Sequence, residues 1–298
     1  MKTATDVAPA PASGGIFASP LRYPGGKGRL GPWLARLMRH NRISGGWYVE
    51  PYAGGAGAAW FLLLQGYVDH IVINDLDPVV HAFWWAVLND SVGLIELIES
   101  TPVTIDSWKQ QKAVLASPEA FTQTQVGFAT FFLNRTNRSG ILKAGVIGGL
   151  EQTGAYAINA RFNKHDLVER VRALSALRTH VTLYGLDALD LLDELRPILP
   201  AKSLIYLDPP YFQKGSQLYR NHYRPDDHAR IATRVLEIET PWVVTYDNCA
   251  EIRALYANCQ GTEFSLHYST GKERPLATEV MFYDNLTLAD EPVLTRGH

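Results

Sequence analysis

The sequence predicts an α/β fold built on a mostly parallel sheet. Five short apolar segments with strand character alternate with segments of helical periodicity, which is the order in which helices connect parallel strands. Two more strand-like segments near the end of the chain are joined by a polar loop and predict an antiparallel hairpin at the edge of the sheet. Several strands end in an acid or a glycine-rich turn. Sheets of this kind bind ligands at the carboxyl ends of their strands.

The composition fits one large domain with an insert. The chain has 298 residues, of which 46% are apolar and 19% are charged, so it can bury a substantial core. The net charge of −2 does not by itself indicate a polyanion partner, so nucleic-acid binding would have to rest on local basic patches. Residues 1–16, rich in Ala, Pro, Thr, Ser and Gly, are expected to be a disordered tail.

The sequence also carries expectations about location and assembly. No apolar run is long enough to span a bilayer, and the first residues lack the apolar region of a signal peptide, so we expect no membrane association. The cysteines, Cys249 and Cys259, form neither a disulfide framework nor a zinc spacing, which favours a reducing cytoplasm. No coiled-coil pattern or apolar association stripe is visible, so we expect a monomer.

A glycine-rich segment opens the folded part of the chain. Gly25, Gly26 and Gly28 lie within four residues, with Lys27 between them, and a helical pattern follows. Glycines permit close approach of the backbone to a ligand, and the lysine adds a cation. The Walker spacing is absent and no strand precedes the segment, so a plain helix-entry loop is an equal alternative.

The first predicted strand, residues 47–52, leads into a second glycine turn. Gly54, Gly55 and Gly57 precede an apolar helix. Strand, glycine turn and helix form the geometry in which a backbone approaches a nucleotide-like ligand. The full dinucleotide fingerprint is missing, so NAD is not specifically indicated.

The second predicted strand, residues 70–75, ends in Asp75 about twenty residues after the glycine turn. An acid at this distance is what a pair of ribose hydroxyls requires, so the combination favours an adenosine-containing cofactor over a structural turn. Asp77 is the competing acid, and its alternative role is to cap the helix that Pro78 opens.

Segment 104–165 is predicted to be a helical insert with a polar loop region between residues 134 and 149. Cations anchor phosphates, and Arg and Asn side chains can recognise base edges. A solvated loop is an equal alternative for this segment taken alone. The candidate nucleic-acid contacts are Arg135, Asn137, Arg138, Lys143, Arg161 and Lys164.

Apart from the fourth strand, four more strands are predicted. Residues 181–187 form the third strand, which ends in Asp187, and residues 242–248 form the fifth. The final hairpin is expected at residues 263–268 and 279–283.

The fourth strand, residues 204–207, leads into Asp208, Pro209, Pro210 and Tyr211. Proline fixes φ and removes a donor, and the residue before a proline is held extended, so this segment predicts a stiff rim at the strand end. One carboxylate, unpaired carbonyls and a flat ring then project into the same space. Such a site suits a planar molecule with an exocyclic amine, and the alternative is a strand that merely ends in a turn.

The ordered set of these motifs resembles the Dam-type DNA adenine-N6 methyltransferases. The resemblance runs from about Pro20 to Asn285 and rests on the set rather than on any single motif. It implies a Rossmann-like seven-stranded sheet with helices on both faces, S-adenosylmethionine as methyl donor and double-stranded DNA as partner. The matching motifs are Tyr23-Pro-Gly-Gly-Lys27, Glu50-Pro-Tyr-Ala-Gly-Gly-Ala-Gly57, Asn74-Asp75, Asn134-Arg135 with Gly140, Asp208-Pro-Pro-Tyr211 and Thr245-Tyr-Asp-Asn248.

The same resemblance implies a division of the chain. A catalytic domain would comprise residues 17–103 and 166–290, interrupted by a helical target-recognition insert over 104–165, with a short tail at 291–298. A cognate restriction endonuclease is a possible partner of such an enzyme. The insert departs from the members that methylate GATC, so the resemblance does not predict the recognition sequence.

Roles for individual residues follow from the resemblance as well. Tyr23 would face the sulfonium, Asp75 would bind the ribose hydroxyls and Asp187 would meet the adenine of the cofactor. Lys27 would lie where cofactor and substrate meet. The remaining implied cofactor contacts are Gly25, Gly26, Glu50, Tyr52, Gly54, Gly55 and Gly57.

On the substrate side, Asp208 and the Pro209 carbonyl would accept hydrogen bonds from the target amine, and Tyr211 would stack on a base that has left the duplex. No metal is required, because the sulfonium is already an activated leaving group. Two alternatives remain: a methyltransferase acting on another nucleobase or RNA amine, and a non-catalytic DNA-binding relic.

Overall fold

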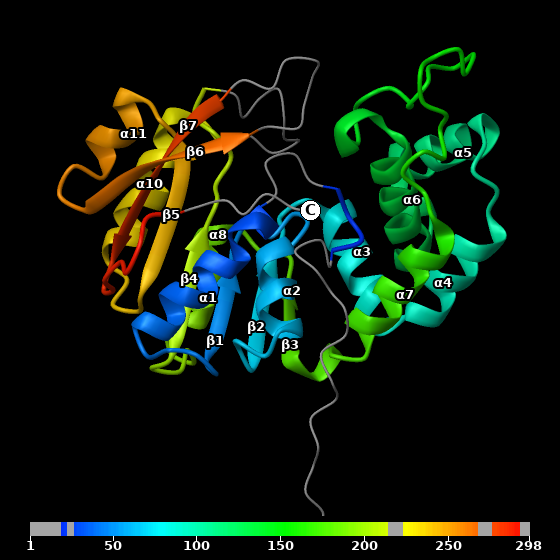
Figure 1. The fold of residues 1–298 in the computed structure, drawn as a ribbon. Helices are drawn as coiled ribbons and strands as arrows, with labels where there is room; N and C mark the ends of the chain where they lie inside the picture. Colours follow the sequence, from blue (N-terminus) through cyan, green and yellow to red (C-terminus); the bar gives the residue numbers. More distant parts are fainter. Residues whose placement is uncertain (1–18, 23–26, 214–222, 268–275, 293–298) are drawn as a thin grey trace, which may run out of the picture.

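The computed structural model describes residues 19–22, 27–213, 223–267 and 276–292. Within these ranges the chain forms a seven-stranded sheet in the order β3-β2-β1-β4-β5-β7-β6 (Figure 1), which confirms the predicted fold. The predicted tail at 1–16 lies outside the described residues, as do residues 293–298. The strands are β1 (Trp47–Glu50), β2 (His70–Asn74), β3 (Val181–Tyr184), β4 (Ser203–Leu207), β5 (Trp242–Asp247), β6 (Gln260–His267) and β7 (Leu276–Asp284).

The strand order makes neighbours of β1, which leads into the glycine turn, and β4, which leads into the two prolines. β1 pairs in parallel with β2 on one side and with β4 on the other, in a register that sets Tyr48 opposite Leu204. From β1 the sheet continues through β2 to β3 on one side, and from β4 it continues through β5 on the other. The loops after these two strands leave the sheet at its topological switch point, where open α/β sheets bind ligands.

Strands β1 to β5 are parallel, and β7 runs antiparallel between β5 and β6. Helices cover both faces of the sheet (Figure 1). The main helices are α1 (Gly31–His40), α2 (Gly57–Leu64), α3 (Pro78–Asn89), α4 (Ser91–Ser100), α5 (Ile105–Ala116), α6 (Gln123–Thr136), α7 (Lys164–Ser175), α8 (Ala188–Leu195), α10 (Pro225–Leu236) and α11 (Ala250–Leu255).

The alternation of side chains along each strand divides the interior into two cores. Ile71 and Ile73 of β2 pack in the core that includes α1, α2 and α3, whereas Val72 between them packs in the core that includes α8, α10 and α11. Successive strand residues point to opposite faces, so a strand that is apolar throughout must be covered on both sides. The helices of the two cores supply this cover.

Helices α4 to α7 group beside the β3 edge of the sheet (Figure 1). A Cβ at Gly127 of α6 would lie 2.6 Å from the carbonyl oxygen of Ala82, so glycine is needed where α6 crosses α3. Thr130 donates a hydrogen bond of 2.9 Å to the Val79 carbonyl, and the rings of Phe83 and Phe131 stack at 5.8 Å. Helix α6, in the segment predicted to be an insert, is thus packed directly on α3 of the sheet layer. Within the described ranges, the structure has no helix long and apolar enough to cross a membrane.

Candidate active site

The two glycine-rich segments meet at the carboxyl end of β1. A Cβ at Gly57 would lie 3.1 Å from the Cα of Gly28, which belongs to the short helix η1 (Lys27–Leu30). Gly54 has a φ of +47° and Ala56 a φ of +46°, so the turn runs twice through the left-handed region. The indole nitrogen of Trp84 donates to the Gly54 carbonyl at 2.8 Å and holds the turn in place. The predicted cofactor contacts Tyr23, Gly25 and Gly26 lie outside the described residues.

Asp75 lies beside this turn at the end of β2. Its carboxylate accepts hydrogen bonds from the backbone nitrogens of Gly54 and Asp77, each at 2.9 Å. Burial raises the pKa of Asp75 to about 7. Asp77 accepts from the Val79 nitrogen at 3.2 Å and caps α3, which is the structural role that the sequence offered as the alternative. Asp75 is therefore the acid in contact with the glycine turn.

Asn74 links the strand ends further, and its function is one that sequence reasoning missed. Its buried side chain donates to the carbonyls of Pro51 at 2.9 Å and Leu186 at 3.0 Å, and accepts from the Leu186 nitrogen at 2.8 Å. The loops after β1, β2 and β3 are thereby held together. Asp187, next to Leu186, caps α8 by accepting from the Leu189 nitrogen at 2.9 Å. Its predicted contact with the cofactor stays a prediction.

Glu50 ends β1 in the interior, where its carboxyl accepts hydrogen bonds from the Tyr48 hydroxyl at 3.0 Å and the Ala59 nitrogen at 3.2 Å. Burial raises the pKa of Glu50 from its ordinary value of 4.5 to about 8. The group is therefore largely protonated at neutral pH. Tyr52, two residues later, shares a hydrogen bond of 2.8 Å with the hydroxyl of Tyr223.

The raised pKa of Glu50 predicts the pH dependence of folding. A carboxyl group that binds a proton more tightly when folded stabilises the native state at low pH, and this contribution is lost as pH rises through the folded pKa. We expect the melting temperature of the cofactor-free enzyme to fall between about pH 5 and pH 8. Glu50→Gln keeps the hydrogen-bond acceptor without the titration, so its melting temperature should fall less over the same range. Parallel curves for the two proteins would contradict this account of Glu50.

The carboxylate of Asp208 is anchored through one oxygen. Oδ1 lies 2.9 Å from the Lys27 ammonium and accepts a hydrogen bond of 2.9 Å from the Thr245 hydroxyl. The hydroxyls of Thr245 and Tyr206 are in turn 2.9 Å apart. Nothing in the described part of the chain donates to Oδ2, and the Asp208 side chain keeps 19% of its surface exposed. One carboxylate oxygen is thus fixed, and the other is available to a ligand.

Lys27 connects Asp208 to a second acid, Glu279. Its ammonium lies 3.3 Å from Oε2 of Glu279 and donates to the Tyr211 hydroxyl at 3.0 Å, and that hydroxyl donates to Oε1 of Glu279. Burial opposes the charged form of Lys27, but the negative charges of Asp208 and Glu279 raise its pKa well above the ordinary value. Lys27 therefore stays protonated, and the first glycine segment is joined to the rim after β4.

Glu279 is a functional candidate that the sequence analysis did not identify. It lies on β7, it is 1% exposed, and it is an acid directly before the apolar residues 280–283 of that strand. That contrast was the available signal, since a buried acid requires a partner. Tyr211 is also buried in this arrangement. Its role in stacking on a base stays a prediction.

The backbone after the two prolines is held by a further acid. Asp247 at the end of β5 accepts hydrogen bonds of 2.9 Å from the nitrogens of Phe212 and Gln213. Pro209 is buried and Pro210 is half-buried. The stiff rim predicted from the prolines is thus also tied to the neighbouring strand.

The predicted DNA contacts in segment 104–165 differ in how far their side chains are exposed. Arg138, Lys143 and Arg161 are exposed and stay candidates for contacting DNA. Lys164 is half-buried and donates to the Glu99 carbonyl at 2.7 Å, at the end of α4.

Asn137 lies in the interior, so its predicted contact with DNA stays a prediction that its side chain does not support. Its side chain is fully buried, accepts from the Trp108 indole at 2.7 Å, and donates to the carbonyls of Ile141 and Leu142 at 3.0 Å. Both ends of the amide are used to shape the loop, so Asn137 is not an exposed base reader. Arg135 is 9% exposed and is considered further below.

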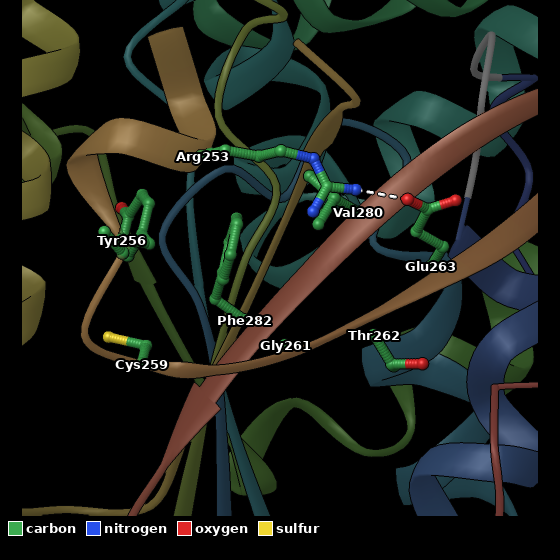
Figure 2. Close-up of a pocket in the computed structure, with 9 residues that line it drawn as sticks. Arg253, Tyr256, Cys259, Gly261, Thr262, Glu263, Val280 and Phe282 are labelled. Carbon is green, nitrogen blue, oxygen red and sulfur yellow. Dashed lines mark hydrogen bonds and ion pairs between the residues drawn. The ribbon is translucent and has the colours of Figure 1, made fainter. Parts of the chain in front are cut away.

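A cavity of about 580 Å³ lies elsewhere, between α11 and the terminal hairpin (Figure 2). Tyr256, Cys259 and Phe282 line it, and the ion pair between Arg253 and Glu263 crosses it. Phe282 faces the core of α8, α10 and α11, whereas Met281 beside it faces the opposite core. The cavity contains none of the predicted site residues and is separate from the Asp208 site.

Comparison with known proteins agrees with the motifs. A profile described as D12 class N6 adenine-specific DNA methyltransferase matches residues 23–273. The type II methyltransferase M.MjaIII of Methanocaldococcus jannaschii is 28% identical over 202 residues, which cover 62% of this chain and 67% of that protein.

Two solved structures show a weaker likeness. A putative RNA methyltransferase from Pyrococcus horikoshii has 10% identity and a TM-score of 0.40, with 86% of this chain and 81% of that chain covered. The rRNA methyltransferase aviRa from Streptomyces viridochromogenes has 12% identity and a TM-score of 0.34, with 84% and 82% covered. Since the family profile spans most of the sequence, the chain belongs to the D12 class of N6 adenine-specific DNA methyltransferases and is an enzyme that methylates adenine in DNA.

Proposed function

We propose that the enzyme transfers a methyl group from S-adenosylmethionine to the N6 amine of an adenine flipped out of double-stranded DNA, and that Asp208 holds this amine. The observation that carries the proposal is the asymmetric anchoring of Asp208. Lys27 and Thr245 hold Oδ1, whereas no described residue donates to Oδ2, and β4 lies next to β1, the strand that leads into the glycine turn. A fixed acceptor in that position can bind an amine hydrogen without reorganising.

The residues around the glycine turn suit the methyl donor. Acids lie at the ends of three adjacent strands, Glu50 at the end of β1, Asp75 after β2 and Asp187 beyond β3. Carboxylates bind ribose hydroxyls, which suits Asp75, whereas the largely protonated Glu50 offers a polar group without a charge. Gly54, Gly55 and Gly57 would let the backbone approach the donor closely. When bound there, S-adenosylmethionine supplies an activated methyl group on a sulfonium.

The contribution of Asp208 and Pro209 is orientation. The lone pair of an adenine amine is delocalised into the ring, which makes the nitrogen a poor nucleophile. Hydrogen bonds to Asp208 Oδ2 and the Pro209 carbonyl would favour a pyramidal nitrogen with its lone pair directed out of the ring plane. When the nitrogen takes the methyl group that S-adenosylmethionine would supply, Asp208 would keep its hydrogen bond to the surplus N6 proton until that proton is lost to water.

The base must leave the duplex to reach this rim, at a cost of about a few kcal/mol of unstacking. Stacking on Tyr211 would offset part of that cost. We further propose that the enzyme acts as a monomer in the cytoplasm. A cognate endonuclease is the partner expected if it serves restriction and modification.

Product analysis tests the proposed function. The enzyme is incubated with double-stranded DNA and S-adenosylmethionine, and the nucleosides are analysed by mass spectrometry. We expect N6-methyladenine, and long-read sequencing of DNA from cells expressing the protein will give the sequence context. N4-methylcytosine as the product, or methylation of RNA but not DNA, would overturn the proposal. Failure to bind S-adenosylmethionine in calorimetry would overturn the assignment of the methyl donor.

A further inference from the structure

Arg22 is held firmly against the insert, immediately before the segment that leads to Lys27. The Asn134 amide accepts from the Arg22 nitrogen at 2.7 Å and donates to the Arg22 carbonyl at 2.7 Å. A Cβ at Gly140 would lie 2.4 Å from that carbonyl oxygen, so the contact also requires a glycine. Arg135 follows Asn134 on α6. The backbone contact therefore brings two arginines from distant parts of the sequence to one place.

Both guanidinium groups contain buried atoms without partners. Arg135 is 9% exposed, and among the described residues neither its Nε nor Nη1 of Arg22 has a hydrogen-bond partner. In the part of the chain that the structure describes, no acid forms an ion pair with Arg22, Arg135 or Arg161. Buried charge is normally paired, because an isolated charge is costly to remove from water. An anion bound here would supply the missing hydrogen-bond acceptors and the missing negative charge for Arg22 and Arg135.

The neighbouring charges support the same conclusion. Burial, together with the positive charges of Arg170, Arg22 and Arg161, lowers the pKa of Arg135 to about 9. Burial and the charge of Arg161 also lower the pKa of Arg22. Asp166 is the acid near Arg135, and it is engaged by Arg170 at 3.0 Å. The arginines therefore repel one another across a site with little compensating negative charge.

We propose that this arginine cluster, Arg22, Arg135, Arg161 and Arg170, binds a backbone phosphate of the DNA strand that carries the target adenine. Guanidinium groups match phosphate oxygens in geometry and charge. Arg22 is five residues from Lys27, which contacts Asp208, so the chain between them spans at most roughly 18 Å. The proposal rests on the proposed function, because it assigns the anion to the substrate DNA.

The test measures binding of a fluorescent DNA duplex by anisotropy over a series of salt concentrations. Each phosphate contact adds about 1 to the slope of log K against log salt. We expect Arg22→Gln and Arg135→Gln each to weaken binding by roughly tenfold and to lower this slope by about 1, equally for duplexes of different sequence. The matched control is Arg172→Gln on α7, an exposed arginine paired with Glu169 at 2.7 Å. Its slope should equal that of the wild type.

Thermal unfolding with inorganic phosphate separates anion binding from a structural role. At matched ionic strength, phosphate should raise the melting temperature of the wild type and of Arg172→Gln more than that of Arg22→Gln. If Arg135→Gln fails to fold, Arg22→Gln, whose side chain is partly exposed, still decides the outcome. Lower melting temperatures with an unchanged salt slope would show a structural role only and would overturn the proposal.

The two proposals fail in different ways. A wild-type enzyme that neither binds duplex DNA nor forms N6-methyladenine would contradict the proposed function itself. A wild-type enzyme that binds and methylates DNA, while Arg22→Gln and Arg135→Gln keep the wild-type salt slope, would contradict only the phosphate site.

Discussion

Replacing Asp208 with alanine is expected to reduce methyl transfer by about 10³-fold or more while S-adenosylmethionine still binds. The variant removes the only side-chain acceptor proposed for the amine, together with the ionic partner of Lys27. Cofactor affinity should survive, because the glycine turn and Asp75 are held by contacts that do not include Asp208. Single-turnover rates with labelled cofactor would measure the first effect, and calorimetry the second.

Two comparisons make this result specific. Asp190→Ala on α8 removes an exposed acid that takes no part in the site, and its rate should match the wild type. Thr245→Val leaves the Asp208 carboxylate in place but removes one of the two groups that hold Oδ1, so a loss of about tenfold is expected. An Asp208→Ala enzyme with a rate near that of Asp190→Ala would end the assignment of Asp208.

The fold could be predicted from the sequence because its signals are local. Strands β1 to β5 coincide with apolar segments bounded by turn residues, the predicted hairpin overlaps β6 and β7, and glycine or proline follows the ends of β1 and β4. Because ligands bind at the carboxyl ends of parallel strands, the glycine turn and Asp208 could be predicted to lie at the same edge of the sheet. The family motifs, in their order, indicated the reaction.

The contacts that join distant segments could not be predicted in the same way. Glu279 reaches Lys27 only because the register of β7 against β5 directs this residue toward the catalytic rim. Arg22 and Asn134 are 112 residues apart, and no local pattern connects them. Asn137 was predicted to contact DNA because its residue type suits base edges, and nothing in the sequence indicates that its amide is buried and hydrogen-bonded within the protein.

Lys27→Met should lower the rate of methyl transfer by about 10²-fold at neutral pH. Lys27 is the cation between Asp208 and Glu279, with distances of 2.9 Å and 3.3 Å to their carboxylates. Without it, these two neighbouring carboxylates lack their common counter-ion and repel each other. The Asp208 carboxylate then loses one of the two groups that fix Oδ1, so it holds the target amine less well.

The double variant Lys27→Met with Glu279→Gln separates this positioning role from a loss of structure. Removing one partner of a buried ion pair destabilises a protein by about 3–5 kcal/mol, and Glu279→Gln removes the more deeply buried of the two carboxylates that Lys27→Met leaves unpaired. Adding Glu279→Gln should therefore raise the melting temperature of Lys27→Met and return part of its activity at neutral pH. Additive losses of stability and activity in the double variant would show that Lys27 does not act through the balance of these charges.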